Sequence, residues 1–379
     1  MYSIYSYGQM LADTPRMEAY TAALCATVKP GSVVLDLGCG PGVFALLACK
    51  LGARRVYAIE PDGVIELARE TALANGVAER IEFYQDFSTD ITLPERADII
   101  VSDLRGMLPW FRQHIPSIID ARNRLLATGG TLIPQRDVLW AAVVEVPDRY
   151  GEIIGPWERG DLNLSAAKGV ATSTFRKARI SPEQLLVAPA CCTKLDYNQI
   201  QSPDLRAEIS WQAERSGTAH GFSLWFDSEL IDDIGFSNNP SAPELIYGNA
   251  LFLFPHPVEI AQGDRIDLRL SADFISDDYV WRWDTTFLST GDLQTKASFT
   301  QSTFFGVPLS AAQLRKQAAT YKPTLDQKGQ IKSFILNSMT GDNSLEEIAT
   351  RLVECFPKHY SDWKAALNDV TAVSLEVGQ

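Results

Sequence analysis

The strongest chemical signal in the sequence is a glycine-rich turn that follows a short apolar segment. Residues 33–42 read VVLDLGCGPG, with Gly38, Gly40 and Gly42 at alternate positions. Glycine lets the backbone approach a ligand closely, and a helix that begins directly after the turn offers free N–H groups. A pyrophosphate-binding loop spaces its glycines as GxGxxG. Here the third glycine comes one position early and Pro41 removes an N–H, which favours a ligand with an adenosine and a carboxylate but no phosphates.

Further candidate ligand-binding residues follow the neighbouring predicted strands. Glu60 ends the second strand, 22 positions after Gly38, where an acid can accept hydrogen bonds from both ribose hydroxyls. Asp86 and Phe87 follow the third strand, where a polar group and an apolar ring would hold an adenine. Together with Asp36 in the first strand, these residues predict a site for S-adenosylmethionine (SAM). The alternative is a site of the NAD type with an unusual loop.

The elements that must position these residues alternate between strand and helix. Strands are predicted at 33–38, 54–60, 80–85 and 97–103, with helices at 43–51 and 61–75 between them. This rhythm is typical of a parallel sheet with helices on both faces. After about residue 137 the apolar residues alternate with period two, which indicates antiparallel strands.

The predicted fold class is therefore α/β with additional domains. We expect a Rossmann-like SAM-binding domain at 1–136, which includes an N-terminal helix. We expect an antiparallel β domain at 137–308, interrupted by a helical or irregular excursion at 150–180. Amphipathic stretches predict a small C-terminal helical domain at 309–379.

Composition excludes several classes of protein. The chain has 379 residues, with 34 Lys and Arg against 47 Asp and Glu and a formal net charge of -13, which argues against nucleic-acid binding. No apolar run approaches the roughly 20 residues of a membrane span, and the N-terminus lacks the apolar core of a signal peptide. The six cysteines form no CxxC pair and the four histidines lie far apart, so zinc spacing is absent. We expect no metal, reduced thiols and a cytoplasmic location.

Several stretches resemble the protein arginine methyltransferase family. SYGQMLADTPRMEAY at 6–20 and the segment 33–60 are similar to its SAM-binding domain. ISPEQLL at 180–186, GFSLWFD at 221–227 and VEIAQGDRIDL at 258–268 are similar to its β-barrel domain. The resemblance is collinear over about residues 2–290.

This resemblance implies a SAM-dependent methyltransferase that forms a homodimer through an arm at 150–180. It also implies roles for residues near the N-terminus. Arg16 would pair with the carboxylate of SAM, and Tyr5 and Tyr7 would lie on the segment that folds over the cofactor. The alternative for Arg16 is a surface helix residue.

The acceptor-binding motifs of the family are altered. The loop SDLRGMLPWFRQH at 102–114 has Asp103 in the place of the family's first glutamate and Arg112 in the place of the second. Residues 244–246 read ELI where the family has Thr-His-Trp. Two carboxylates grip a guanidinium, and an arginine beside one would repel it. Asp103, Arg112 and His114 are thus candidate catalytic residues for a different acceptor, a small molecule or a peptide. We expect Asp103 and Arg112 either to form an internal ion pair or to bind the two ends of a zwitterionic acceptor.

Other interpretations stay open from the sequence. Arg112 is also compatible with a solvated helix residue, and His114, a possible base, with an ordinary helix-side residue. The chain is also compatible with a genuine protein arginine methyltransferase with a divergent site, or with a catalytically silent SAM-binding regulator.

The C-terminal stretches weakly resemble the winged-helix domains related to PqqD, which bind leader peptides. The likeness depends on a Gly-Asp-Asn-Ser turn followed by SLEEIA, in which Ser344 and Glu347 have the spacing of a capping box. The alternative is a helical appendage that packs on the barrel.

Overall fold

The computed structural model describes residues 3–158, 160–308 and 310–377. The chain divides into two compact units, Met1–Pro308 and Leu309–Gln379. Each unit is described by itself. No helix among the described residues is long and apolar enough to cross a membrane.

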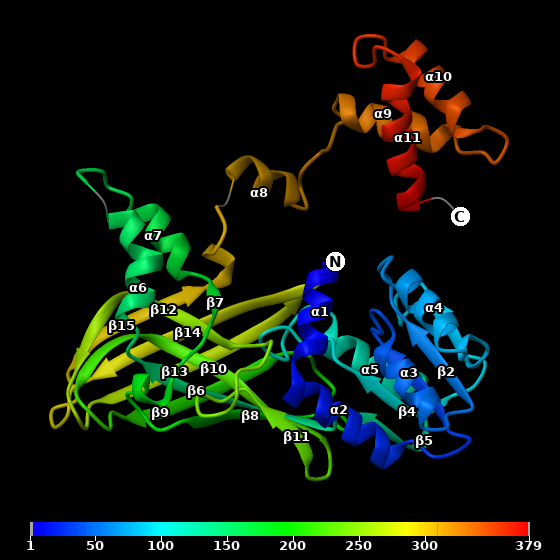
Figure 1. The fold of residues 1–379 in the computed structure, drawn as a ribbon. Helices are drawn as coiled ribbons and strands as arrows, with labels where there is room; N and C mark the ends of the chain where they lie inside the picture. The colour runs from blue at the N-terminus through cyan, green and yellow to red at the C-terminus, as the bar shows by residue number, and fades with distance from the viewer. Residues whose placement is uncertain (1–2, 159, 309, 378–379) are drawn as a thin grey trace. The chain divides into compact units, whose positions relative to one another are not determined.

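The first part of the larger unit is a five-stranded parallel sheet in the order β3-β2-β1-β4-β5 (Figure 1). Its strands are β1 (Val33–Leu37), β2 (Arg55–Ile59), β3 (Ile81–Tyr84), β4 (Ala97–Ser102) and β5 (Leu126–Ile133). The helices around it are α1 (Ile4–Ala12), α2 (Thr14–Thr27), α3 (Val43–Lys50), α4 (Ile65–Ala74) and α5 (His114–Arg124). β1 pairs in parallel with both β2 and β4, so the strand order reverses at β1, where ligands bind in open α/β sheets.

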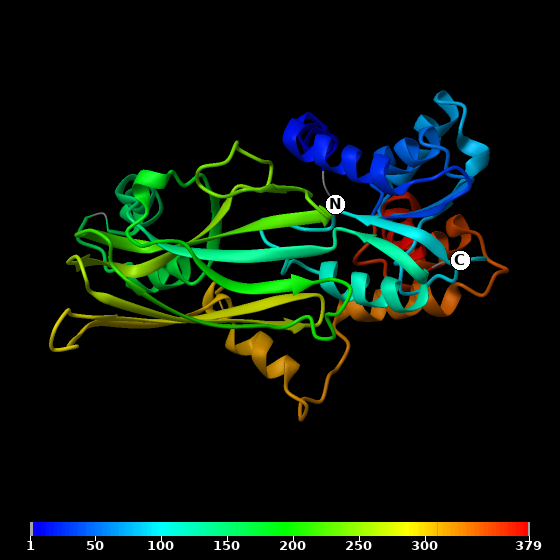
Figure 2. The same ribbon diagram turned by 90° about the horizontal axis from the view of Figure 1, so that it is seen from below.

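Both faces of this sheet are buried, which explains the continuous apolar strands of the sequence. Val34 packs with residues of α2, α3 and α4, whereas the adjacent Leu35 packs on the opposite face with residues of α5. Figure 2 shows α5 on one side of the sheet and the blue N-terminal helices on the other. The predicted α/β fold is confirmed.

The second part of the larger unit consists of two antiparallel sheets. One has the order β7-β12-β10-β6-β8, with β11 paired to β10, and the other has the order β15-β14-β13-β9. The strands are β6 (Arg136–Val144), β7 (Phe175–Ala178), β8 (Ala190–Asp196), β9 (Leu205–Gln212), β10 (Gly217–Ile231), β11 (Ile234–Ser237), β12 (Asn249–Ile260), β13 (Arg265–Ile275), β14 (Asp278–Leu288) and β15 (Thr295–Ser302). Among the described strands no ladder joins the two sheets, so this part is a pair of antiparallel sheets and the expected β-barrel stays a prediction.

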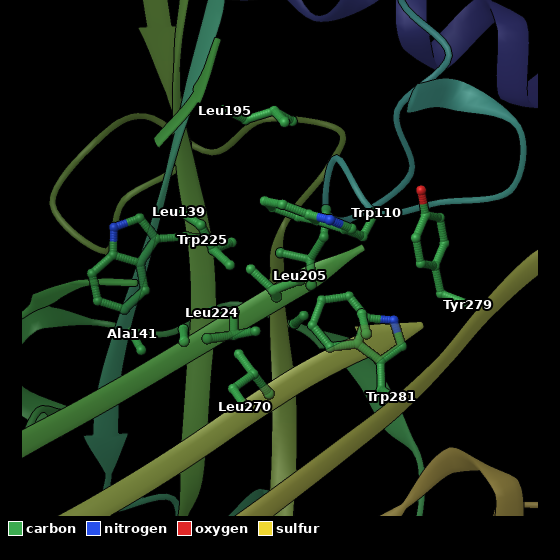
Figure 3. Packing of buried hydrophobic residues seen from close by; sticks show 14 of the residues in the cluster. Trp110, Leu139, Ala141, Leu195, Leu205, Leu224, Trp225, Leu270, Tyr279 and Trp281 are labelled. Carbon is green, nitrogen blue, oxygen red and sulfur yellow. The ribbon is translucent and has the colours of Figure 1, made fainter. Parts of the chain in front are cut away.

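Aromatic and aliphatic side chains fill the space between the two sheets. Phe252 of β12 lies 4.7 Å from Phe222 of β10 and 5.0 Å from Trp283 of β14, measured between ring centroids. In Figure 3, Leu224 of β10 and Leu270 of β13 point into the same cluster from opposite sheets. Buried and more exposed residues alternate along β9, β13 and β14, as in β-sandwiches, whereas β10 and β12 each contain a run of consecutive buried residues.

The excursion predicted at 150–180 is mainly helical. It contains α6 (Pro147–Ile154), the 3-10 turn η2 (Gly155–Glu158) and α7 (Ser165–Thr172), before β7 returns to the sheet. Tyr150 and Ile154 of α6 are buried against residues of β6 and β12. Trp157 and Leu162 remain 39% and 73% exposed, so this excursion presents apolar side chains to solvent.

The smaller unit is helical, with α8 (Ala311–Gln317), α9 (Gln327–Ser338), α10 (Leu345–Cys355) and α11 (Trp363–Val377). Ile335, Leu352 and Val370, one from each of α9, α10 and α11, are fully buried in its core. The capping box of Ser344 and Glu347 is confirmed at the start of α10. No strand lies within residues 310–377, so the described part of this unit has no wing.

Candidate functional site

The glycine turn connects β1 to α3 in a backbone conformation that requires glycine. Gly38 and Gly40 have φ values of 75° and 50°, in the left-handed region. The N–H groups of Gly38 and Cys39 both donate to the carbonyl oxygen of Ile59, at 2.9 Å each. The turn is thereby fixed against the end of β2, at the carboxyl edge of the sheet.

The turn is closely covered by side chains. A Cβ on Gly40 would lie 2.8 Å from Cε1 of Tyr7, and a Cβ on Gly38 would lie 2.1 Å from Cδ2 of Leu104. Tyr7 is 9% exposed, whereas Tyr5 is 72% exposed on the same helix, α1. Of the two tyrosines expected near the cofactor, Tyr7 therefore lies on the glycine turn.

Glu60 is directed at the glycine turn. Its Oε2 accepts a hydrogen bond of 3.0 Å from the N–H of Gly40, and its Oε1 accepts one of 3.1 Å from the N–H of Asp62. Burial raises the pKa of this carboxyl. A carboxylate offers about four acceptor sites, and these two bonds leave capacity for ligand hydroxyls.

The other predicted binding residues differ in their surroundings. Asp36 is buried below the turn, where it accepts a hydrogen bond of 2.8 Å from the N–H of Ala45 in α3, and burial raises its pKa to about 7. It therefore holds the first turn of α3. Asp86 and Phe87 are exposed after β3, and the ring of Phe87 is 56% exposed at the same edge of the sheet.

Asp103, at the end of β4, is the centre of a buried ionic network. Its Oδ2 accepts hydrogen bonds of 2.6 Å from Nε of Arg16 and 2.6 Å from the hydroxyl of Tyr247. Its Oδ1 accepts one of 3.2 Å from Nε of Arg105. Burial by itself would raise the pKa of Asp103, but Arg16 and Arg105 together lower it to about 2. Asp103 is thus a fixed negative charge and a weak proton acceptor.

Arg16 is buried rather than a surface helix residue, with 6% of its area exposed. Besides Asp103, its Nη1 donates to the carbonyl oxygen of Met10 at 3.1 Å. The resemblance assigns Arg16 to a ligand carboxylate. In this structure its guanidinium contacts the carboxylate of Asp103, and its role towards SAM stays a prediction.

Arg105 is the functional residue that the sequence analysis missed. Its side chain is fully buried, and its Nη1 donates to Oδ1 of Asp137 at 2.9 Å and to Oγ of Ser228 at 2.6 Å. Its Nη2 donates to the hydroxyl of Tyr20. The sequence shows only an arginine two positions after Asp103, in a loop that contains a second arginine, Arg112.

Arg112 does not form the expected pair with Asp103. It is exposed, its N–H donates to Oδ1 of Asp278 at 3.1 Å, and its guanidinium lies over the ring of Phe111. The φ of 43° at Arg112 turns the loop outward before α5 begins. The internal ion pair predicted for this loop exists, but Arg105 provides the cation.

His114 is a buried member of the same network. Its Nε2 lies 2.9 Å from the hydroxyl of Tyr197, which donates to Oδ2 of Asp137 at 2.5 Å. Burial lowers the pKa of His114 to about 3, so the ring is uncharged near neutral pH. This position favours the alternative of an ordinary packed histidine over a catalytic base.

The segment at 244–246 does reach the site, although it lacks the family's histidine and tryptophan. The N–H of Ile246 donates to Oδ2 of Asp13 at 2.7 Å, at the start of α2. This contact brings the following residue, Tyr247, onto Asp103 and Arg16. No sequence pattern singles out Tyr247, because its partners Arg16 and Asp103 lie in distant parts of the chain.

Two family descriptions match the larger unit. "Arginine methyltransferase oligomerization subdomain" matches residues 135–286, and "Ribosomal protein L11 methyltransferase (PrmA)" matches residues 18–141. Protein arginine N-methyltransferase 2 of Mus musculus is 30% identical over 275 residues, or 68% of this chain and 61% of that protein. The chain belongs to the protein arginine methyltransferase family. Probable protein arginine N-methyltransferase 6 of Arabidopsis thaliana, a second family member, is 30% identical over 62% of this chain and 55% of its own length.

Solved structures of family members share the fold. Protein arginine methyltransferase 10 of Arabidopsis thaliana has a TM-score of 0.71 at 21% identity, over 79% of this chain and 97% of that one. A chain of the Trypanosoma brucei PRMT1 enzyme-prozyme heterotetrameric complex with AdoHcy has a TM-score of 0.70 at 21% identity, over 78% and 96%. The chain spans about three fifths of the first curated relatives, and the two matched family descriptions together cover residues 18–286.

Proposed function

We propose that this chain is a SAM-dependent methyltransferase. The observation that carries the proposal is the juxtaposition of the glycine turn, Tyr7 and the carboxylate of Glu60 at the switch point of the sheet. Glu60 would hold the ribose hydroxyls, and Asp86 and Phe87 would hold the adenine. Family membership supports SAM over a nicotinamide cofactor.

When bound, SAM supplies a methyl group activated by a sulfonium. The chain's residues would then align the acceptor with that group, because an in-line displacement depends mainly on position. The low pKa of Asp103 makes it a poor base, so its role would be to orient groups by its charge. His114, buried on Tyr197, would hold the network in place without accepting the acceptor's proton.

We further propose that the acceptor is not protein arginine. Within residues 102–114 Asp103 is the only acid, and it is accompanied by Arg105 and Arg112. A guanidinium acceptor needs negative charge close by, and this loop carries more cations than anions. A neutral or anionic group on a small molecule or peptide fits this loop better. The relatives' names favour the alternative, a genuine protein arginine methyltransferase.

Two measurements test these proposals separately. Calorimetry with SAM and with S-adenosylhomocysteine should give saturable binding to the wild-type chain, and absence of binding would contradict the cofactor assignment. Labelled SAM should transfer methyl groups to a component of an extract but not to glycine-arginine peptides. Methylarginine formed by the wild type would support the alternative, and binding without any transfer would support a silent regulator.

We also propose that the chain forms a homodimer through the arm at 150–180. The match to an oligomerization subdomain and the exposed Trp157 and Leu162 support it. A contact of the same surface on both copies would close a two-fold dimer. We place the protein in the cytoplasm, which its six free thiols support.

A further inference from the structure

The surroundings of Arg105 have the composition of a binding site for a guanidinium. The guanidinium carbon lies 5.4, 5.3 and 5.9 Å from the ring centroids of Phe226, Phe236 and Tyr247. Carboxylates of Asp103 and Asp137 accept from its Nε and Nη1. Aromatic faces and carboxylates are the two kinds of group that recognise an arginine side chain.

The positive and negative charges around the guanidinium of Arg105 are equal in number. Arg16 and Arg105 supply two positive charges, and Asp103 and Asp137 supply two negative ones. Each carboxylate oxygen of this set already accepts a hydrogen bond, Oδ2 of Asp137 from Tyr197 and the others from the two arginines and Tyr247. An external cation would therefore add an unbalanced charge to a desolvated site, which is strongly unfavourable.

We propose that Arg105 is a specificity-determining residue that fills a guanidinium-binding site from within the chain and so excludes cationic acceptors. The site lies beside Asp103, at the carboxyl end of β4, where the acceptor is expected to bind. This inference rests on the proposed function for the identity of the acceptor site. It narrows the acceptor to a neutral or anionic group.

Removal of the Arg105 side chain tests whether the residues around it can bind a guanidinium from solution. Arg105→Ala leaves Asp103 and Asp137 facing the space that the guanidinium occupied. Its melting temperature should fall, and millimolar methylguanidinium should restore it in a saturable manner, beyond the effect of sodium chloride or methylammonium. The wild type should show no such rise. Arg54→Ala, which breaks the exposed pair with Glu95, is the matched control and should not respond.

A second variant covers the case in which Arg105→Ala does not fold. Arg105→Gln keeps an amide that donates towards Asp137 and removes only the positive charge, so the carboxylates of Asp103 and Asp137 outnumber the remaining cation, Arg16. A glycine-arginine peptide should bind this variant at least about tenfold more tightly than the wild type in fluorescence anisotropy. Equal peptide binding by both proteins, or a methylguanidinium response no larger than that of Arg54→Ala, would overturn the proposal.

The cofactor is measured in parallel so that the two proposals fail separately. Calorimetry with SAM on the wild type and on Arg105→Gln reports on the cofactor site alone. Loss of SAM binding in the wild type would refute the methyltransferase, while the guanidinium response would still decide the role of Arg105. A purely structural arginine would affect the melting temperature without selective recovery by methylguanidinium.

Discussion

The hydroxyl of Tyr247 donates a hydrogen bond of 2.6 Å to Oδ2 of Asp103, across 144 positions of the chain. This bond joins the end of β4 to the segment that precedes β12. It therefore links the parallel sheet to the antiparallel part of the larger unit at the candidate acceptor site.

Tyr247→Phe should destabilise the larger unit by about 1–3 kcal/mol, because a buried carboxylate loses a donor. Urea unfolding followed by tryptophan fluorescence would measure the change. Tyr5→Phe, at an exposed phenol, is the control and should have little effect. Equal stability of Tyr247→Phe and the wild type would show that the bond contributes nothing.

Glu60→Ala should weaken SAM binding by at least about tenfold, because each hydrogen bond to a charged group contributes roughly 1.5–3 kcal/mol. The variant also releases the N–H of Gly40, which shapes the glycine turn. Calorimetry gives the dissociation constant directly, with Glu66→Ala on α4 as an exposed control. An unchanged constant would place the ribose elsewhere.

His114 should make the protein sensitive to acid. Its pKa is about 3 in the folded chain, below the ordinary value of 6.5, so its contribution is complete above pH 6.5 and is lost progressively as the pH falls towards 3. Between pH 6.5 and 5 the free energy of unfolding should drop by about 2 kcal/mol from this residue. His114→Gln should show a smaller drop in urea unfolding at pH 7 and 5. His256→Gln, at an exposed histidine, is the control, and equal drops in the wild type and His114→Gln would contradict this prediction.

Arg112→Glu should change stability by no more than about 0.5 kcal/mol, because Arg112 is exposed and makes no ion pair with Asp103. The same variant should not methylate glycine-arginine peptides, because the guanidinium of Arg105 still pairs with the carboxylate of Asp103. Mass spectrometry of the peptides after incubation with SAM is the readout. Methylarginine from Arg112→Glu but not from the wild type would transfer the specificity role from Arg105 to Arg112.

Leu162→Asp and Trp157→Asp should convert the proposed dimer into a monomer, because a charge in an apolar contact is costly to desolvate. Light scattering at micromolar concentration would report the mass. Leu293→Asp, at an exposed leucine in the turn between β14 and β15, should leave the dimer intact. A dimer that persists in both arm variants would place the interface on another surface.

The sequence predicts the parts of the molecule that depend on local spacing. The apolar strands, the glycine turn and Glu60 can be predicted from local residue order. The glycine turn and Glu60 both lie at the carboxyl edge of the parallel sheet. Positions that follow successive parallel strands meet at that edge, and Asp103, directly after β4, is one of them.

The partners of Asp103 could not be predicted in the same way. Arg105 contacts Ser228 and Tyr20 across 123 and 85 positions, and no periodic pattern encodes contacts of that range. Two arginines lie in the loop, and the local sequence does not distinguish the buried one from the exposed one. The φ of 43° at Arg112, which turns that residue outward, is also invisible in the sequence.

The balanced charges around Arg105 restrict which substitutions this buried ionic network can accept during evolution or engineering. Replacement of either Arg105 or Asp137 alone leaves the other buried charge without its partner, which lowers the free energy of unfolding by about 3–5 kcal/mol. That is a large fraction of the roughly 5–15 kcal/mol that keeps a domain folded. A lineage that exchanges one acceptor class for another must therefore change both positions together, or first accumulate stabilising substitutions elsewhere. A library intended to change the proposed acceptor specificity should randomise positions 105 and 137 as a pair.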